Sequence, residues 1–337
     1  MSPLAGYEAA ARERLPRAHY DYFAGGAGDE GAVAENEAAF ARLRLAPRVL
    51  SGAVPDPAVT LLGCRASLPL LIAPTAFHRL AHPDGELATA RAAAAEETVM
   101  VVSMASTTAI EPLAETGATL WFQLYVQPDM AFTERVVARV EKAGCRALVV
   151  TADSPVFGTR PRDLHNGFHA LPAHLACENL REGDVVRRVE FSPEISWAHL
   201  DRLREVTDLP LVVKGVTHPA DARLAIDHGA ALVMVSNHGG RQLDRTAAPI
   251  DLLPGIVEAV DGAVPVTLDG GIRRGTDVVA ALALGARAVL LGRPVIWALA
   301  AGGEAGVREV LGWFRTEIES AMALAGSPLD PSVVRRC

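Results

Sequence analysis

The chain has 337 residues, of which 50% are hydrophobic and 21% are charged, and its net charge is −8. This composition is typical of a globular protein, and the acidic balance argues against nucleic acid as a partner. Four cysteines lie far apart with no C-x-x-C pair, which argues against a disulfide framework or a zinc site. The sequence shows no signal-peptide pattern and no apolar run of membrane-spanning length, so we expect a cytoplasmic protein without metal or membrane contacts.

Residues 1–65 precede the first predicted strand, and we expect them to form short helices that cover one end of the fold or border a site. Beyond them, eight short apolar or β-branched runs recur, separated by segments with the apolar spacing of helices. The eight runs are 69–73, 99–103, 120–125, 147–151, 210–214, 231–236, 265–269 and 288–292. Glycines such as Gly144 and Gly285 end helical segments shortly before a strand, as left-handed residues after a helix do.

Eight β–α units without an internal linker predict a single domain over residues 1–337, built as an α/β fold. We expect a (β/α)8 TIM barrel over 66–325 with the N-terminal extension of 1–65 before it, and an open, doubly wound sheet is the alternative. A long segment from 154 to about 195 follows the fourth strand and is rich in proline, histidine and arginine. Long loops after barrel strands commonly act as lids or specificity loops.

Polar side chains stand at the carboxyl ends of nearly all eight predicted strands. In chain order they are Thr75, Ser103, Gln123, Tyr125, Thr151, Asp153, Lys214, Ser236, His238, Asp269 and Arg293. Active sites of such barrels lie at these ends, and a barrel that served only as a scaffold would not need charged groups there. The pattern predicts one shared site, although a single member such as Asp153 is also compatible with a helix cap.

The segment 236–244, with the sequence SNHGGRQLD, follows the sixth predicted strand directly. His238 can accept a proton near neutral pH, and Arg241 can hold a carboxylate. Gly239 and Gly240 allow the backbone to turn sharply and to approach a ligand closely. The segment therefore offers a base and a carboxylate-binding group in one turn.

The last two predicted strands end in a pattern typical of a phosphate site. Residues 269–276, with the sequence DGGIRRGT, form a glycine-rich loop leading into a helix, where free N–H groups and the helix dipole favour an anion. Residues 292–294, with the sequence GRP, add a further N–H and a guanidinium group. Loops after the seventh and eighth strands commonly hold phosphate in this fold, and a plain turn is the alternative.

Ordered motifs extend over nearly the whole chain. Besides SNHGGRQLD they are HYDYFAGGA at 19–27, APTA at 73–76, HPDGE at 82–86, WFQLY at 121–125, VKG at 213–215, LDGG at 268–271 and LGRP at 291–294. Together they resemble the FMN-dependent α-hydroxy-acid oxidases and dehydrogenases. That family includes glycolate oxidase, lactate oxidase, mandelate dehydrogenase and hydroxymandelate oxidase, and the match is most similar to the last of these.

The resemblance implies an FMN cofactor at the mouth of the barrel. The residues it assigns to the isoalloxazine ring are Thr75, Ala76, Ser103, Gln123, Thr151, Lys214 and Ser236. Lys214 would lie by the N1 edge and stabilise the reduced, anionic ring, a role that suits a fixed cation. The residues it assigns to the ribityl chain and phosphate are Asp269, Gly271, Arg273, Gly292 and Arg293.

The resemblance also implies roles toward the substrate. The residues it assigns to the substrate carboxylate are Arg160, Arg241 and Tyr22. Tyr125 would hydrogen-bond the hydroxyl or keto oxygen, His238 would take a proton during oxidation, and Asp153 would stabilise the resulting imidazolium. Whether hydrogen leaves Cα as hydride or as a proton stays open, because His238 is needed in both cases. Arg160 is also compatible with a solvated charge beside Arg162.

Three departures from the family pattern bear on the substrate. Glycolate-oxidase-like members carry a bulky tryptophan shortly after the serine of the second strand, whereas this chain has Met104 and Ala105, which would open the pocket for an aryl group. Thr159 stands where an arginine is common. The loop 171–193 is short for the family and lacks the apolar insert of membrane-bound mandelate dehydrogenases.

We therefore expect FMN-dependent oxidation of an (S)-2-hydroxy acid, such as mandelate or 4-hydroxymandelate, to a 2-oxo acid in a homotetramer. Oxygen is the expected acceptor, with hydrogen peroxide as the product. Alternatives are a small aliphatic substrate such as lactate or glycolate, another acceptor, and an FMN oxidase of a specialised pathway. An FMN-dependent isopentenyl diphosphate isomerase would need a diphosphate site, which Arg160, Arg241 and His238 do not suit. Intact His238, Lys214 and Arg241 argue against a non-catalytic binding protein.

Overall fold

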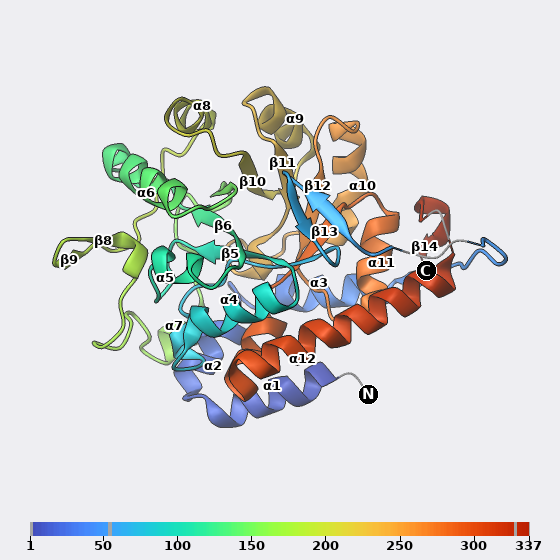
Figure 1. Ribbon diagram of the computed structural model, residues 1–337, viewed down its shortest axis with the longest axis horizontal. Coiled ribbons are helices and arrows are strands. Elements are labelled where there is room, and N and C mark those ends of the chain that lie inside the picture. Colours follow the sequence, from blue (N-terminus) through green and yellow to red (C-terminus); the bar gives the residue numbers. More distant parts are fainter. Residues whose placement is uncertain (1–2, 53–55, 327–328, 337) are drawn as a thin grey trace.

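The computed structural model describes residues 3–52, 56–326 and 329–336. Eight parallel strands close into a barrel in which the last strand pairs with the first (Figure 1). In order around the barrel they are β4 (Leu70–Ile72), β5 (Val99–Ser103), β6 (Thr119–Leu124), β7 (Leu148–Thr151), β10 (Leu211–Val216), β11 (Leu232–Val235), β12 (Val266–Asp269) and β13 (Ala288–Leu291). The closed barrel confirms the predicted (β/α)8 fold and excludes the open, doubly wound sheet.

Helices follow the barrel strands and cover the outside of the barrel. They are α4 (Gly85–Ala95), α5 (Ile110–Ala114), α6 (Met130–Lys142), α8 (Trp197–Val206), α9 (Pro219–Asp227), α10 (Pro249–Val260), α11 (Gly275–Ala283) and α12 (Arg293–Ala325). Outward strand residues such as Ile72 share one apolar core with helix residues such as Val136. Capping side chains fix where some helices start. The Asp129 side chain accepts from the N–H of Phe132 at 3.0 Å and caps the N-terminus of α6.

The inner face of the barrel changes from apolar to polar along the strands. Near their amino ends, Leu71, Val101 and Trp121 share a buried cluster with the hairpin of β2 (Val59–Leu61) and β3 (Cys64–Ala66), which closes that end. Successive side chains of a strand point to opposite faces. Residues two or four positions after an inward-facing residue therefore also face the interior of the barrel. Those residues are Ser103, Gln123, Thr151, Lys214, Ser236 and Asp269. The strand period therefore gathers polar groups at the carboxyl end.

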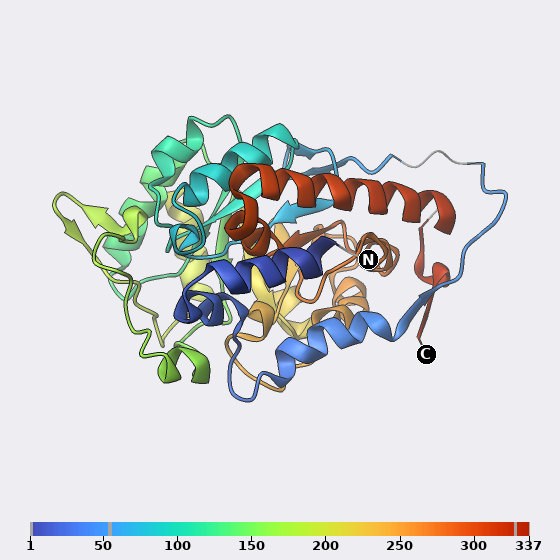
Figure 2. The same ribbon diagram turned by 90° about the horizontal axis from the view of Figure 1, so that it is seen from below.

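The extension before the barrel packs in two places, along α12 and at the carboxyl end of the barrel. It contains α1 (Pro3–Arg14), α2 (Arg17–Ala24), α3 (Gly31–Ala41) and β1 (Leu43–Leu45). α1 lies along α12, as Figure 2 shows, and β1 pairs antiparallel with β14 (Val334–Arg336). Tyr22 of α2 lines the main cavity at the carboxyl end of the barrel. The expected short helices are present and border the site, while a hairpin closes the opposite end.

The segment between β7 and α8 is the expected long insertion. It contains α7 (Pro161–His165), the 3₁₀ turn η2 (Glu178–Leu180) and a hairpin of β8 (Arg181–Glu182) and β9 (Val185–Val186). Figure 1 shows this hairpin projecting at one side of the barrel. Further 3₁₀ turns are η1 (His78–Leu80), η3 (His238–Gly240) and η4 (Pro331–Val333).

Two features of the described residues bear on membranes and metals. Within that part of the chain, no helix has both the length and the apolar character needed to cross a lipid bilayer. The same residues contain no group of three or more His, Cys, Asp or Glu side chains arranged to hold a metal ion.

Candidate active site

A cavity of about 940 Å³ opens at the carboxyl ends of the barrel strands. The predicted site residues that line it are Tyr22, Thr75, Ala76, Ser103, Gln123, Tyr125, Thr151, Arg160, Lys214, His238, Arg241, Asp269, Gly271, Arg273, Gly292 and Arg293. The remaining two do not line the cavity but contact residues that do. Asp153 contacts His238, and Ser236 contacts Lys214. The cavity thus brings together residues from the ends of all eight strands.

His238 lies directly after β11, and both of its ring nitrogens are close to polar groups. Its Nδ1 lies 2.9 Å from Oδ1 of Asp153, and its Nε2 lies 3.4 Å from the hydroxyl of Tyr125. Its backbone N–H donates to Oγ of Ser236 at 3.0 Å. With Nδ1–H bonded to Asp153, the lone pair of Nε2 faces Tyr125 and is free to accept a proton.

Burial and charge tune the acid–base groups around His238. Burial lowers the pKa of His238 below its usual value, although Asp153 opposes that shift. Burial would raise the pKa of Asp153, yet the charges of His238 and Lys214 hold it below its usual value. Burial and the Asp153 carboxylate raise the pKa of Tyr125. At neutral pH, His238 is a neutral base beside a carboxylate, and Tyr125 keeps its proton.

Lys214 is a buried cation that lines the cavity. Its Nζ donates to Oγ of Ser236 at 2.9 Å and lies 3.3 Å from Oδ2 of Asp269. The other oxygen of that carboxylate, Oδ1 of Asp269, is buried and has no hydrogen-bond partner among the described residues. Because an unsatisfied buried acceptor costs about 1–3 kcal/mol, this oxygen is suited to receive a donor from a bound ligand.

Gln123 on β6 links three neighbouring strand ends. Its Oε1 accepts from the Ser103 hydroxyl and from the N–H of Met104, both at 3.2 Å. Its Nε2 donates to Oγ1 of Thr151 at 3.0 Å. These bonds fix the orientation of the amide, so the three strand ends present a fixed row of polar groups to the cavity.

Arg241 is held by hydrogen bonds to the N-terminal extension. Its Nη1 donates to the carbonyl oxygens of Tyr22 at 2.6 Å and Gly25 at 2.9 Å. Its guanidinium also lies over the ring of Tyr22, 4.9 Å from the ring centre. Neutral acceptors orient the guanidinium without neutralising its charge, so the charge remains available to an anion in the cavity.

Arg160 brings a second positive charge close to Arg241. Its Nε donates to the backbone carbonyl of Arg241 at 3.4 Å, and its guanidinium lies 4.1 Å from the ring centre of Phe157. Burial and the charge of Arg241 lower the pKa of Arg160 to about 10. The carboxylate of Asp163 is 3.9 Å away, which is too long for a hydrogen bond. A bound carboxylate would satisfy both guanidinium groups.

The loops after β12 and β13 both line the cavity, through Gly271 and Arg273 and through Gly292 and Arg293. The backbone N–H groups of Arg273 and Arg274 both donate to Asp277 at 2.9 Å, and that of Gly275 donates to Glu317 at 2.8 Å. The N-terminus of α11 is therefore already capped by protein carboxylates. The N-terminus of α12 also lines the cavity, through the segment 292–294, and offers the helix end that suits an anion.

Arg293 begins α12 and is held by backbone carbonyls. Its Nε donates to Phe23 at 3.0 Å, its Nη1 to Gly239 at 3.0 Å and its Nη2 to Gly25 at 2.9 Å. Burial and the nearby charge of Arg241 lower the pKa of Arg293 to about 9. This guanidinium, like that of Arg241, has orienting contacts while its charge is left for an anion.

The insertion supplies an aromatic wall that no motif indicated. Phe157, Phe168 and Phe191 line the cavity. The ring of Phe191 lies 4.9 Å from that of Tyr125 and 5.6 Å from that of Phe157, both edge to face. The length of the insertion after β7 was the available signal, but it did not show which side chains would point inward.

The two residues after Ser103 have different positions. Ala105 lines the cavity, as expected for a residue that opens the substrate pocket. Met104 is wholly buried in the core between barrel and helices and does not line the cavity. The expectation that Met104 shapes the pocket is therefore wrong, because strand alternation points its side chain outward.

A buried amide pair attaches the extension to the turn after β11. Nδ2 of Asn36 donates to Oδ1 of Asn237 at 2.9 Å, and Nδ2 of Asn237 donates back at 2.7 Å. Asp244 accepts from the N–H of Ala32 at 2.8 Å and caps α3. Asn36 and Asn237 are 201 positions apart, so no local pattern could have indicated their contact.

Known proteins are similar to this chain over nearly its whole length. The family model for FMN-dependent dehydrogenase matches residues 11–333. Glycolate oxidase of Spinacia oleracea is 45% identical over 335 residues, covering 95% of this chain and 90% of the relative. L-lactate oxidase of Nostoc sp. is 45% identical over 342 residues, covering 96% of this chain and 94% of the relative.

Solved structures agree with the sequence comparison. The crystal structure of mandelate oxidase with (S)-2-phenylpropionate matches with a TM-score of 0.90 and 45% identity, covering 96% of this chain and 94% of the other. A mandelate oxidase variant with (S)-mandelic acid matches with a TM-score of 0.91 and the same identity and coverage. Fold, sequence and site geometry therefore point to the same class of proteins.

Proposed function

This chain belongs to the FMN-dependent dehydrogenase family, and we propose that it oxidises (S)-2-hydroxy acids bearing an aryl or similarly bulky apolar group. It is an FMN-dependent 2-hydroxy-acid oxidase, and its relatives include proteins named glycolate oxidase, lactate oxidase and mandelate oxidase. The observation that carries the choice of substrate is the aromatic wall of Phe157, Phe168 and Phe191.

The residues present in the cavity fit FMN. The volume of about 940 Å³ lies within the range of roughly 300–1,000 Å³ typical of ligand sites. Lys214 supplies a buried cation, and the unpartnered Oδ1 of Asp269 supplies an acceptor. Arg293 and the start of α12 suit the phosphate. When bound, FMN accepts the two electrons that leave the substrate.

The carboxylate of the substrate is the proposed partner of Arg160 and Arg241. Both guanidinium groups line the cavity, and each is oriented by a backbone carbonyl. A planar carboxylate can accept two parallel hydrogen bonds from a guanidinium, which fixes the orientation of Cα as well as binding the acid. Tyr22, whose ring lies beneath Arg241, completes this part of the site.

His238 is the proposed base. Its Nε2 and the hydroxyl of Tyr125 lie 3.4 Å apart, so one substrate oxygen placed beside this pair can lie within hydrogen-bond distance of both. The proton passes to Nε2, either from the hydroxyl or from Cα, and Asp153 stabilises the imidazolium through Nδ1. Tyr125 donates its hydrogen bond to the same oxygen, which gains keto character as the reaction proceeds.

The group on Cα would face the aromatic wall. Phe191 packs edge to face against both Tyr125 and Phe157, so the wall continues from the reacting groups to the outer cavity. Aromatic pairs in this arrangement gain about 0.5–1.5 kcal/mol beyond the burial of area, which favours an aryl substrate. The small side chain of Ala105, which also lines the cavity, leaves space for it.

Oxygen is the proposed acceptor and hydrogen peroxide the proposed product, in keeping with relatives that are named oxidases. The cytoplasmic location and the homotetramer stay predictions.

The test is a substrate panel of (S)-mandelate, (S)-4-hydroxymandelate, (S)-lactate and glycolate, with flavin bleaching measured anaerobically and peroxide measured in air. We expect kcat/KM for the two aryl acids to exceed that for lactate and glycolate by about 10- to 100-fold. Phe191→Ala should reduce this ratio. Preference for lactate or glycolate would refute the aryl proposal, and bleaching by none of the four would refute oxidation of these acids.

A further inference from the structure

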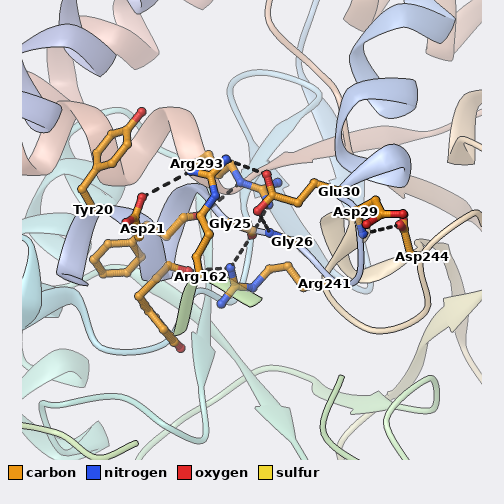
Figure 3. A network of polar contacts seen from close by, with 12 residues as sticks. Tyr20, Asp21, Gly25, Gly26, Asp29, Glu30, Arg162, Arg241, Asp244 and Arg293 are labelled. Carbon is orange, nitrogen blue, oxygen red and sulfur yellow. Dashed lines mark hydrogen bonds and ion pairs between the residues drawn. The ribbon is translucent and has the colours of Figure 1, made fainter. Parts of the chain in front are cut away.

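The turn that ends α2 and leads to α3, residues 22–30 including the last three residues of α2, is enclosed by charged side chains from three other parts of the chain (Figure 3). Arg162 approaches it from α7, Arg241 from the loop after β11, and Arg293 from the start of α12. Asp244 holds the far end of the turn by accepting from the N–H of Asp29 at 2.9 Å. Arg162, unlike Arg241 and Arg293, does not line the cavity.

One carbonyl of this turn accepts hydrogen bonds from two arginines that line the cavity. The oxygen of Gly25 accepts from Nη1 of Arg241 and from Nη2 of Arg293, each at 2.9 Å. The neighbouring carbonyls of Tyr22 and Phe23 give each guanidinium a second acceptor, at 2.6 and 3.0 Å. The position of this short backbone segment therefore sets the orientation of both guanidinium groups.

Arg162 bridges the two ends of the turn. Its Nη2 donates to Oε2 of Glu30 at 2.5 Å, and its Nη1 donates to Oδ1 of Asp21 at 3.4 Å. The other oxygen of Glu30, Oε1, accepts from the N–H of Gly26 at 3.1 Å. The Arg162 guanidinium thus connects Asp21, which precedes the turn, with Glu30, which ends it. Through Glu30 it also holds Gly26 at the centre of the turn.

The turn needs such contacts because its own backbone does not select one shape. Gly25 and Gly26 are consecutive glycines, which have wide conformational freedom. Glu30 has a φ of 63°, in the left-handed region that residues other than glycine rarely adopt. Contacts from outside are therefore required to keep the carbonyls of the turn aimed at the two arginines.

We propose that Arg162 is a positioning residue: its ion pairs with Asp21 and Glu30 fix the turn whose carbonyls orient Arg241 and Arg293. A cluster outside the cavity thereby sets the affinity for the substrate carboxylate and for the cofactor phosphate together. This inference rests on the proposed function, which assigns Arg241 to the carboxylate and Arg293 to the phosphate.

The experiment compares Arg162→Met, Arg162→Lys and Glu30→Gln with Arg202→Met. Arg202 is a matched control, since its side chain is 48% exposed against 39% for Arg162 and it also pairs with two carboxylates, Glu134 and Glu205. Three quantities are measured for each variant: the dissociation constant of FMN from flavin fluorescence, the dissociation constant of (S)-mandelate, and the limiting rate of anaerobic flavin bleaching.

In Arg162→Met we expect both dissociation constants to rise by about 5-fold or more, with the limiting rate nearly unchanged. Arg162→Lys should recover part of each loss, because it keeps the charge but not the fork of donors. Glu30→Gln should move both constants in the same direction while keeping an acceptor for Gly26. Arg202→Met should leave both constants unchanged.

Unchanged constants in Arg162→Met and Glu30→Gln, or a change in one constant alone, would overturn the inference. Should Arg162→Met fail to fold, Glu30→Gln decides by the same criteria. Arg241→Met separates this outcome from failure of the proposed function: if that variant binds (S)-mandelate as tightly as the original protein, the assignment of Arg241 to the carboxylate is itself wrong.

Discussion

His238 combines a strained backbone with a proton-accepting ring. Its φ of 57° lies in the left-handed region, which costs a residue other than glycine about 1–3 kcal/mol. Surrounding contacts maintain this conformation: Ser236 accepts its N–H, Asp153 holds Nδ1, and the adjacent Asn237 is bonded to Asn36. The strain is therefore balanced by contacts that aim Nε2 at the cavity before any substrate arrives.

The buried position of His238 predicts how activity depends on pH. Burial lowers its pKa below the usual 6.5, so the neutral, proton-accepting form persists to more acidic pH than for a free histidine. We expect the second-order rate constant of flavin bleaching by the acid to fall only below about pH 6.5 and to reach a plateau above it. The raised pKa of Tyr125 predicts no loss from that hydroxyl in mildly alkaline solution.

A matched variant identifies the titrating group. His238→Asn should lower the rate of bleaching by about 10²–10⁴-fold and should remove the acid limb from the profile. An acid limb centred above pH 6.5, or one that survives in this variant, would show that another group titrates.

At the scale of elements, one side-chain amide attaches the last part of the insertion between β7 and α8 to the barrel. Nε2 of Gln127 donates to the carbonyl of Glu190 at 2.7 Å, and its Oε1 accepts from the N–H of the same residue at 2.9 Å. Nε2 also donates to the carbonyl of Tyr125 at 2.9 Å. Gln127 therefore places Phe191, the next residue of the insertion, against the ring of Tyr125.

This attachment predicts a selective effect of Gln127→Ala. The variant removes two hydrogen bonds to the backbone of Glu190, each worth about 0.5–1.5 kcal/mol, so Phe191 is held less firmly. We expect kcat/KM to fall about 10-fold for (S)-mandelate and much less for (S)-lactate, which does not reach the aromatic wall. Steady-state kinetics with both acids is the measurement, and an equal fall for both would contradict a role in specificity.

The elements that sequence could predict are those with a local pattern. All eight barrel strands were indicated by short apolar runs, and Gly144 and Gly285 take the expected left-handed φ of 92° and 104°. The site residues at strand ends follow from the same alternation, because the inward positions of a strand are fixed by its period of two.

What sequence could not predict depends on contacts between distant segments. The pairing of Asn36 with Asn237 and the inward direction of Phe191 arise from how loops pack, and loops have no period. The α11 terminus resembled an anion site because the sequence shows its glycines, whereas its occupation by Glu317 is a long-range contact. The same limit explains why the function of Arg162 required the structure.

At the scale of the molecule, the site is shared by every strand, so ligand binding and folding are linked. The residues assigned to FMN come from the carboxyl ends of the strands and from the loops that follow them, from β4 to β13. A ligand that binds the folded state alone stabilises it by about 2.7 kcal/mol when its concentration is 100 times its dissociation constant.

Removal of FMN should therefore lower the midpoint of thermal unfolding by several degrees, and adding FMN back should restore it in a concentration-dependent way. Differential scanning calorimetry of the apoprotein with increasing FMN checks this. Riboflavin, which lacks the phosphate, is the control and should restore less. A midpoint that does not respond to FMN would contradict cofactor binding across the closed barrel.

Barrel closure also has a consequence for synthesis. β4 pairs with β5, which follows it closely, and with β13, which is made near the end of the chain. During translation one edge of β4 therefore has no neighbour, and exposed strand edges are sites of wrong association between chains. Such late, long-range pairing slows folding. That edge of β4 is open to association with other chains until β13 is made and pairs with it.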